Sequence, residues 1–163
     1  MGITTITTTA RVLKNNITIE VGKIEWVAKP LPMGHGPIAQ AISTLFSTYY
    51  TVYESAEKEA KQIANVSYYP VKDEILIQVE EQKWKTESNT FGPSKIVFED
   101  IEYVIHEKIT GKFVIMQGEE IVAEGVCRFR SVVISSYPKK LETFLAYLSV
   151  GLLIRTLFGE MGV

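Results

Sequence analysis

The most constraining feature of the chain is the stretch LETFLAYLSVGLLIRTLF at residues 141–158. A helix that meets water on one side carries a polar face there. Here the apolar side chains point in every direction around the helix: Phe144, Leu145, Tyr147, Leu148, Val150, Leu152, Leu153, Ile154, Leu157 and Phe158. Such a helix is expected to be buried on all sides. The uncharged run 143–154 is shorter than the roughly 20 residues that cross a bilayer, which favours a core helix over the alternative, a membrane anchor.

Composition narrows the classes of protein that fit. A length of 163 residues predicts a single domain, residues 1–163, with a sizeable core. The net charge of −2 and pI near 5.8 argue against a nucleic-acid-binding protein. One cysteine, Cys127, and two histidines leave too few ligands for a typical zinc site, so we expect no metal and no cofactor. The N-terminus lacks the layout of a secretory signal, which predicts a cytoplasmic protein, at most peripheral to a membrane.

The first 30 residues indicate strands. Residues 3–12 are rich in Thr and β-branched side chains, which favours a strand at a sheet edge. In residues 17–28 the apolar positions switch from odd to even at Gly22. This predicts a type II′ hairpin at Gly22-Lys23 that pairs Val21 with Ile24 and Ile19 with Trp26. A bulge within one long strand is the alternative.

A long amphipathic helix is predicted next, over residues 37–64. Pro37 suits the first turn of a helix, and Asn65 suits its C-cap. Its apolar residues are spaced alternately three and four apart: Ile38, Ile42, Leu45, Tyr49, Val52, Ala56 and Ile63.

The period of the apolar residues returns to two after Tyr69. Residues 75–79 predict a strand, and the polar residues 85–94 predict a loop. A meander is expected over residues 95–98, 101–107, 112–117, 121–129 and 132–137, with Gly111 and Gly118 in turns. Pro138 then opens the last helix. The predicted fold is α+β, in which six to nine antiparallel strands form a curled or barrel-like sheet around the buried C-terminal helix.

Residues 112–154, KFVIMQGEEIVAEGVCRFRSVVISSYPKKLETFLAYLSVGLLI, resemble the end of the tubby-like superfamily. That superfamily includes the LURP-one-related proteins and the C-terminal domain of phospholipid scramblases. The resemblance rests on the strand pattern, Gly118, Ala123 and the apolar helix. It implies a helix threaded through a closed β-barrel and an interaction with lipid. The chain departs from the pattern in its predicted helix 37–64 and lacks the basic cluster that holds phosphoinositide head groups in tubby domains. No functional residue is therefore carried over.

Two groups of residues are candidate ligand sites. Gly34, His35 and Gly36 precede a predicted helix start, where free N–H groups attract anions, although a simple turn that redirects the chain is the favoured interpretation. Arg128, Arg130, Lys139 and Lys140 are the main basic concentration; surface solubility is the favoured interpretation, and binding of an anionic lipid or phosphate is the alternative.

Three further residues are interpreted as structural. Arg155, inside so apolar a helix, is expected to reach the barrel mouth or pair with a carboxylate. Strand alternation groups Cys127 with Ile121, Ala123 and Phe129 on the apolar face of the sheet, whereas His106 falls on the polar face. Cys127 and His106 are therefore predicted to point to opposite sides of the sheet, which argues against a nucleophile and base pair. We assign no catalytic residue.

The sequence therefore predicts a non-enzymatic binding module that interacts with lipid or a hydrophobic ligand. The first alternative is a homo-oligomeric or complex-forming subunit that uses the helix face of Ile38, Ile42, Leu45, Tyr49 and Val52. The second is a small enzyme with an anion site at residues 34–37.

Overall fold

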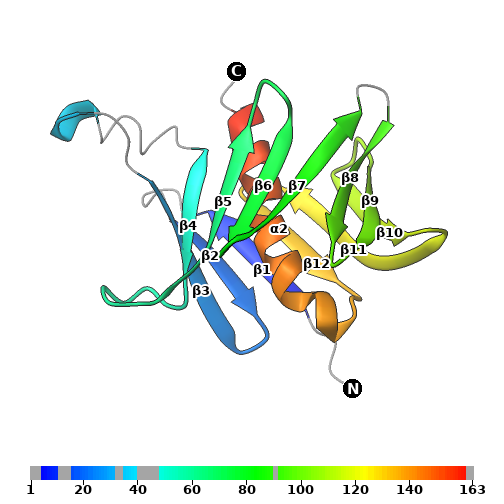
Figure 1. The fold of residues 1–163 in the computed structure, drawn as a ribbon, viewed down its shortest axis with the longest axis horizontal. Helices are drawn as coiled ribbons and strands as arrows, with labels where there is room; N and C mark the ends of the chain where they lie inside the picture. Colours follow the sequence, from blue (N-terminus) through cyan, green and yellow to red (C-terminus); the bar gives the residue numbers. More distant parts are fainter. Residues whose placement is uncertain (1–4, 11–15, 32–34, 40–47, 90–91, 161–163) are drawn as a thin grey trace.

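Twelve antiparallel strands close into a β-barrel around one helix (Figure 1). The computed structural model describes residues 5–10, 16–31, 35–39, 48–89 and 92–160. The strands are β1 (Thr5–Ala10), β2 (Ile17–Val21), β3 (Ile24–Pro30), β4 (Tyr49–Tyr53), β5 (Gln62–Tyr69), β6 (Glu74–Val79), β7 (Gln82–Asn89), β8 (Gly92–Phe98), β9 (Ile101–Glu107), β10 (Lys112–Gln117), β11 (Glu120–Arg128) and β12 (Ser131–Ser135). A short 3₁₀ turn, η1 (Lys139–Leu141), leads into α2 (Glu142–Glu160).

The barrel closes where β1 pairs with β12. Each other strand pairs with its sequence neighbours, whereas Ile6 of β1 lies opposite Ile134 of β12 and opposite Val21 of β2. The prediction that the first strand lies at a sheet edge was therefore wrong. Closure gives β1 a hydrogen-bonded neighbour on both sides, which removes the exposed edge.

The hairpin predicted at Gly22-Lys23 is confirmed. Val21 pairs with Ile24, and Ile19 pairs with Trp26. Gly22 has a φ of 60°, the positive value that a type II′ turn needs at its first central position. The alternating apolar pattern was sufficient to set this register.

The meander is also confirmed, with differences in detail. The strands expected over residues 101–107 and 112–117 have the predicted bounds, and Gly111 and Gly118 take positive φ values of 91° and 62°. The expected total of six to nine strands was too low. The loop predicted over residues 85–94 was wrong, because β7 and β8 occupy most of it. Thr86 and Ile96 face the interior there, while polar side chains cover the outer face.

The long helix predicted over residues 37–64 was wrong. Residues 37–39 are helical and residues 40–47 lie outside the described part, but β4 begins at Tyr49 and β5 at Gln62. The segment YYTVY consists of aromatic and β-branched residues, which favour strands. Tyr50 and Val52 point into the barrel. The three-and-four spacing was therefore coincidental.

The helix α2 lies inside the barrel, as its all-round apolar surface predicted (Figure 1). Its side chains pack against β1, β2, β5, β6, β11 and β12. Residues 139–159 are long and apolar enough to cross a membrane, yet 67% of the most apolar window is buried in the protein. A helix covered by its own barrel needs no bilayer, which is consistent with a domain that folds in water.

Aromatic residues fill the barrel where α2 begins. Phe144 stacks on Phe98 of β8 with ring centroids 4.3 Å apart, and Trp84 of β7 packs edge-on against both. Near the other end of α2, Phe158 contacts Tyr68 of β5. The helix therefore contacts the barrel wall through aromatic pairs near both of its ends.

Candidate functional site

The predicted anion site at residues 34–37 gains no further ligand group in the structure. Gly34 lies outside the described residues, while His35 and Gly36 are exposed in a bend between β3 and β4. No hydrogen bond or ion pair of His35 is seen within the described part of the chain. The geometry of this bend therefore gives no support for an anion site beyond that of a simple turn.

The four predicted basic residues are not brought together. Arg128 and Arg130 flank the turn between β11 and β12, whereas Lys139 and Lys140 follow the far end of β12. Lys139 donates to Glu142 at 2.8 Å, which explains its place near the helix start. The two pairs thus belong to opposite ends of the barrel.

One end of the barrel carries large apolar side chains at the tips of three hairpins. We call it the basic end and define it by residues 70–73, 108–112 and 128–130. Val71 is 101% exposed, Ile109 108% and Phe129 72%. Ile38, in the β3–β4 connection at the same end, is 77% exposed. The other large apolar side chains that the structure exposes lie on strands or directly after one and are 50–57% exposed: Ile24, Leu31, Val97 and Ile121.

Each exposed tip lies beside a cation. Lys72 follows Val71, Lys108 precedes Ile109, and Phe129 lies between Arg128 and Arg130. The guanidinium of Arg130 lies over the Phe129 ring, 5.2 Å from its centroid. Lys112, at the start of β10, adds a further cation at this end.

Two carboxylates at the basic end belong to exposed residues but accept hydrogen bonds from within the protein. Asp73 accepts a hydrogen bond from the Tyr68 hydroxyl at 2.7 Å, and Glu107 accepts one from Arg155 of α2. Burial, and then the hydrogen bond to Asp73, raise the pKa of Tyr68. The charges presented at the tips are therefore mainly positive.

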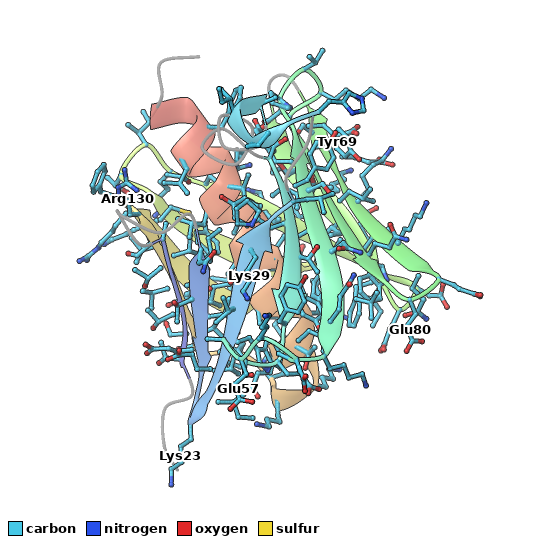
Figure 2. All side chains as sticks on the ribbon, turned by 90° about the vertical axis from the view of Figure 1, so that its left-hand side faces the viewer. Lys23, Lys29, Glu57, Tyr69, Glu80 and Arg130 are labelled. Carbon is cyan, nitrogen blue, oxygen red and sulfur yellow. The ribbon has the colours of Figure 1, made fainter. Side chains whose placement is uncertain are left out.

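The opposite end has the opposite character. Its turns, at residues 54–61, 80–81, 99–100 and 118–119, define the acidic end. They carry the carboxylates Glu54, Glu57, Glu59, Glu80, Glu81, Glu99, Asp100 and Glu119, which outnumber the lysines at this end: Lys23, Lys58, Lys61, Lys139 and Lys140. Figure 2 shows Tyr69 and Arg130 toward the end where α2 finishes, and Lys23, Glu57 and Glu80 toward the other. The barrel is thus polarised along α2.

Cys127 and His106 do not form a catalytic pair. Cys127 packs against the core and His106 is exposed, so they lie on opposite sides of the barrel wall as predicted. Burial raises the pKa of the Cys127 thiol, which makes it a weaker nucleophile at neutral pH. No group of three His, Cys, Asp or Glu side chains suited to a metal ion occurs within the residues described.

One grouping on the sheet was wrong. Cys127 was placed with Ile121, Ala123 and Phe129 on a single apolar face, but Ile121 and Phe129 are exposed. A register shift in the β10–β11 pair places Ile115 opposite Ala123 and Met116 opposite Ile121, which leaves Val122 as the extra residue. Such a bulge reverses the alternation on one side of it.

Sequence reasoning missed Val71, Lys72, Lys108 and Ile109. The available signal was a large apolar residue beside a lysine within a turn, in YPVKD and EKITG. Isolated exposed apolar residues are common, so each occurrence alone carries little information. Only the closed barrel places these turns at one end.

No protein-family model matches the chain, and neither does any curated protein or solved structure. The closed barrel around a buried C-terminal helix is the architecture that the tubby-like resemblance implied. The functional argument therefore rests on the surface of this molecule.

Proposed function

We propose that the protein is a non-enzymatic module that docks through its basic end onto a membrane surface containing anionic lipid. The observation that carries this proposal is the apolar tip beside a cation, repeated at Val71, Ile109 and Phe129. Side chains at hairpin tips can enter the interface while the barrel stays intact. Lysines and arginines beside them meet the phosphates of the head groups.

The cations and apolar tips of the basic end can supply enough free energy for micromolar binding to a membrane. Each cation near an anionic membrane surface contributes about 1 kcal/mol. The basic end offers five: Lys72, Lys108, Lys112, Arg128 and Arg130. Each buried CH₂ adds about 0.8 kcal/mol. A dissociation constant of about 1 μM corresponds to about −8 kcal/mol, which these contributions reach before the costs of immobilisation are subtracted.

We also propose that the protein is a member of the tubby-like superfamily. The closed barrel and threaded helix support it, and so does the pattern of residues 112–154. A cytoplasmic location at a membrane surface follows from the same reasoning. The docking surface itself is argued from the exposed tips of this chain and not from a relative.

The oligomer alternative loses the helix on which it was based. Val52 is fully buried in the barrel wall, and Ile42 and Leu45 lie outside the described residues. Oligomerisation through another surface stays a hypothesis that native mass spectrometry tests. The enzyme alternative gains no second group near His35 among the described residues.

Vesicle flotation tests the docking proposal. We expect the protein to float with vesicles of phosphatidylcholine and phosphatidylserine, to float poorly with phosphatidylcholine alone, and to be released as salt rises and screens the charges. The Val71→Ser/Ile109→Ser variant should bind several-fold more weakly. The Lys72→Glu/Lys108→Glu variant should lose both binding and salt dependence.

The control is Lys139→Glu/Lys140→Glu, which makes the same charge change at the other end of the barrel. It should bind anionic vesicles like the parent protein. Equal binding to neutral and anionic vesicles, or a loss of binding in the control variant alone, would contradict docking through the basic end.

A further inference from the structure

The outer face of β10, β11 and β12 holds a groove next to the apolar tips. Its volume is about 380 Å³, and its lining includes Lys108, Lys112 and Arg128 together with Val114, Val126 and Val133. Ligand pockets in proteins span roughly 300–1,000 Å³. The groove is therefore large enough for one acyl chain or a small head group and too small for a two-chain lipid.

The strand register explains the floor of the groove. Val126 of β11 lies opposite Val133 of β12 and opposite Lys112 of β10. The valines are partly exposed on the outside of the barrel, although most outward positions are polar. An apolar strip on an outer barrel face leaves a surface that an apolar ligand can cover.

The cations gather at the end of the groove nearest the tips. The N–H of Lys108 donates to the carbonyl of Lys112 at 2.8 Å, which keeps these two residues side by side across the β9–β10 turn. Arg128 ends β11 at the same level, directly before Phe129. None of these three side chains forms an ion pair with the described residues.

Glu124 sets the direction in which an anion can bind. It lies opposite Val114 and opposite Ser135, four residues before Arg128 along β11. A negative head group is therefore attracted to the Lys112 and Arg128 end and repelled from the Glu124 end. The groove is polarised in the same sense as the whole barrel.

We infer that this groove binds an anionic single-chain lipid, with its head group at Lys108, Lys112 and Arg128 and its chain on Val126 and Val133. This inference rests on the proposed function, because it places the ligand beside the tips that meet the membrane. It adds a binding site for one lipid molecule to a surface that otherwise recognises only charge. The proposed ligand is a lipid and not a free phosphate ion, because only a lipid has an acyl chain that contacts the valines.

Isothermal titration with soluble probes tests the groove without any membrane. The probes are dodecyl phosphate below its critical micelle concentration, dodecyl maltoside with the same chain and no charge, and inorganic phosphate with no chain. We expect dodecyl phosphate to bind about tenfold more tightly than dodecyl maltoside, which offers no charge to the cations, and about tenfold more tightly than inorganic phosphate, which offers no chain to the valines. Equal binding of all three probes, or tighter binding of inorganic phosphate, overturns the inference.

Two variants locate the site. Lys112→Ser/Arg128→Ser should weaken dodecyl phosphate binding about tenfold, and Val126→Thr should weaken it while leaving inorganic phosphate unaffected. Lys83→Ser, on the outer face of β7, is the matched control and should bind like the parent protein. Unchanged binding in Lys112→Ser/Arg128→Ser overturns the assignment, and a circular dichroism spectrum checks that each variant is folded.

The tip variant Val71→Ser/Ile109→Ser separates the two proposals. It should bind dodecyl phosphate like the parent protein and still bind vesicles poorly. If the parent protein bound dodecyl phosphate but no vesicles, membrane docking would be contradicted and the groove assignment would stand. If the parent protein bound vesicles but bound all three probes equally, only the groove assignment would be contradicted.

Discussion

The guanidinium of Arg155, near the end of α2, is ion paired and hydrogen bonded to the carboxylate of Glu107 on β9. The Arg155 side chain is only 18% exposed. Burial lowers the pKa of Arg155, and the negative charge of Asp73 opposes that shift. The sequence predicted that this arginine would reach the barrel mouth or find a carboxylate. The structure shows the carboxylate and places the pair at the basic end.

Replacing Glu107 should destabilise the protein. Glu107→Ala leaves a largely buried guanidinium without its partner, and we expect the free energy of unfolding to fall by about 1–3 kcal/mol. Because Glu107 is 39% exposed, water offsets part of the loss and the larger values known for fully buried pairs do not apply. Urea denaturation measures the change. Glu102→Ala breaks the exposed pair with Lys95 and should change stability by less than about 1 kcal/mol; equal effects of the two substitutions would contradict this account.

A buried hydroxyl pair joins β1 to α2. Thr8 Oγ1 lies 2.6 Å from Ser149 Oγ, and Ser149 donates to the carbonyl of Ala146, so Thr8 is the donor to Ser149. Both residues are fully buried. Ser149→Ala should cost about 1–3 kcal/mol, because the Thr8 hydroxyl loses its acceptor.

Removing both hydroxyls should recover most of that loss. In Thr8→Val/Ser149→Ala no buried hydroxyl is left without a partner, so the double variant should be more stable than Ser149→Ala alone. Urea denaturation of the parent protein, both single variants and the double variant closes the cycle. Strictly additive losses would show that the two hydroxyls do not depend on each other.

Close approach between α2 and β6 depends on a glycine. A Cβ at Gly151 would collide with Cγ2 of the buried Ile75 side chain. Gly151→Ala should therefore destabilise by about 1–3 kcal/mol despite the better helix propensity of alanine. Gly159, in the same helix, has open space around its Cβ position. Gly159→Ala should be neutral or stabilise by up to about 1 kcal/mol, and thermal unfolding distinguishes the two outcomes; a stable Gly151→Ala variant would mean that the helix shifts freely inside the barrel.

Buried tyrosines should make the protein sensitive to alkali. Burial, then hydrogen bonds to Asp73 and Glu142, raise the pKa values of Tyr68 and Tyr137. An unfolded chain loses each phenolic proton near pH 10, whereas the folded state retains it. The unfolded state then binds fewer protons, so stability falls as pH rises above about 10, by up to about 1.4 kcal/mol per pH unit for each phenol.

Urea denaturation between about pH 9 and pH 12 measures this slope, and Tyr68→Phe should make it shallower. Absorbance titration of the phenolates gives an independent reading. If all eight tyrosines of the folded protein titrated near pH 10, the buried phenols would not be the cause.

Much of the fold follows from local pattern. The alternation that places Val21 opposite Ile24 and the apolar circumference of α2 both specify burial directly, because strand and helix periods differ. The strands over residues 101–107 and 112–117 were located for the same reason. Residues 49–53 were wrongly predicted to be helical, because Tyr49 and Val52 satisfy a helical spacing although their residue types favour a strand.

The candidate surface could not be obtained in this way. Val71, Ile109 and Phe129 lie far apart in the sequence, and each is ordinary alone. Arg130 and Lys139 are close in sequence, yet β12 separates them and carries them to opposite ends. The predicted basic group, which was based on proximity in the sequence, therefore combined residues from the two ends of the barrel.

By itself the sequence determined that α2 is buried and that a meandering antiparallel sheet surrounds it, because the periodicity of apolar side chains is a local property of each element. The tertiary structure alone decided that β1 closes on β12, that Arg155 meets Glu107, and that one end of the barrel is basic with apolar tips. These relationships join residues distant along the chain. They depend on the number of strands and on their direction, which no single segment encodes.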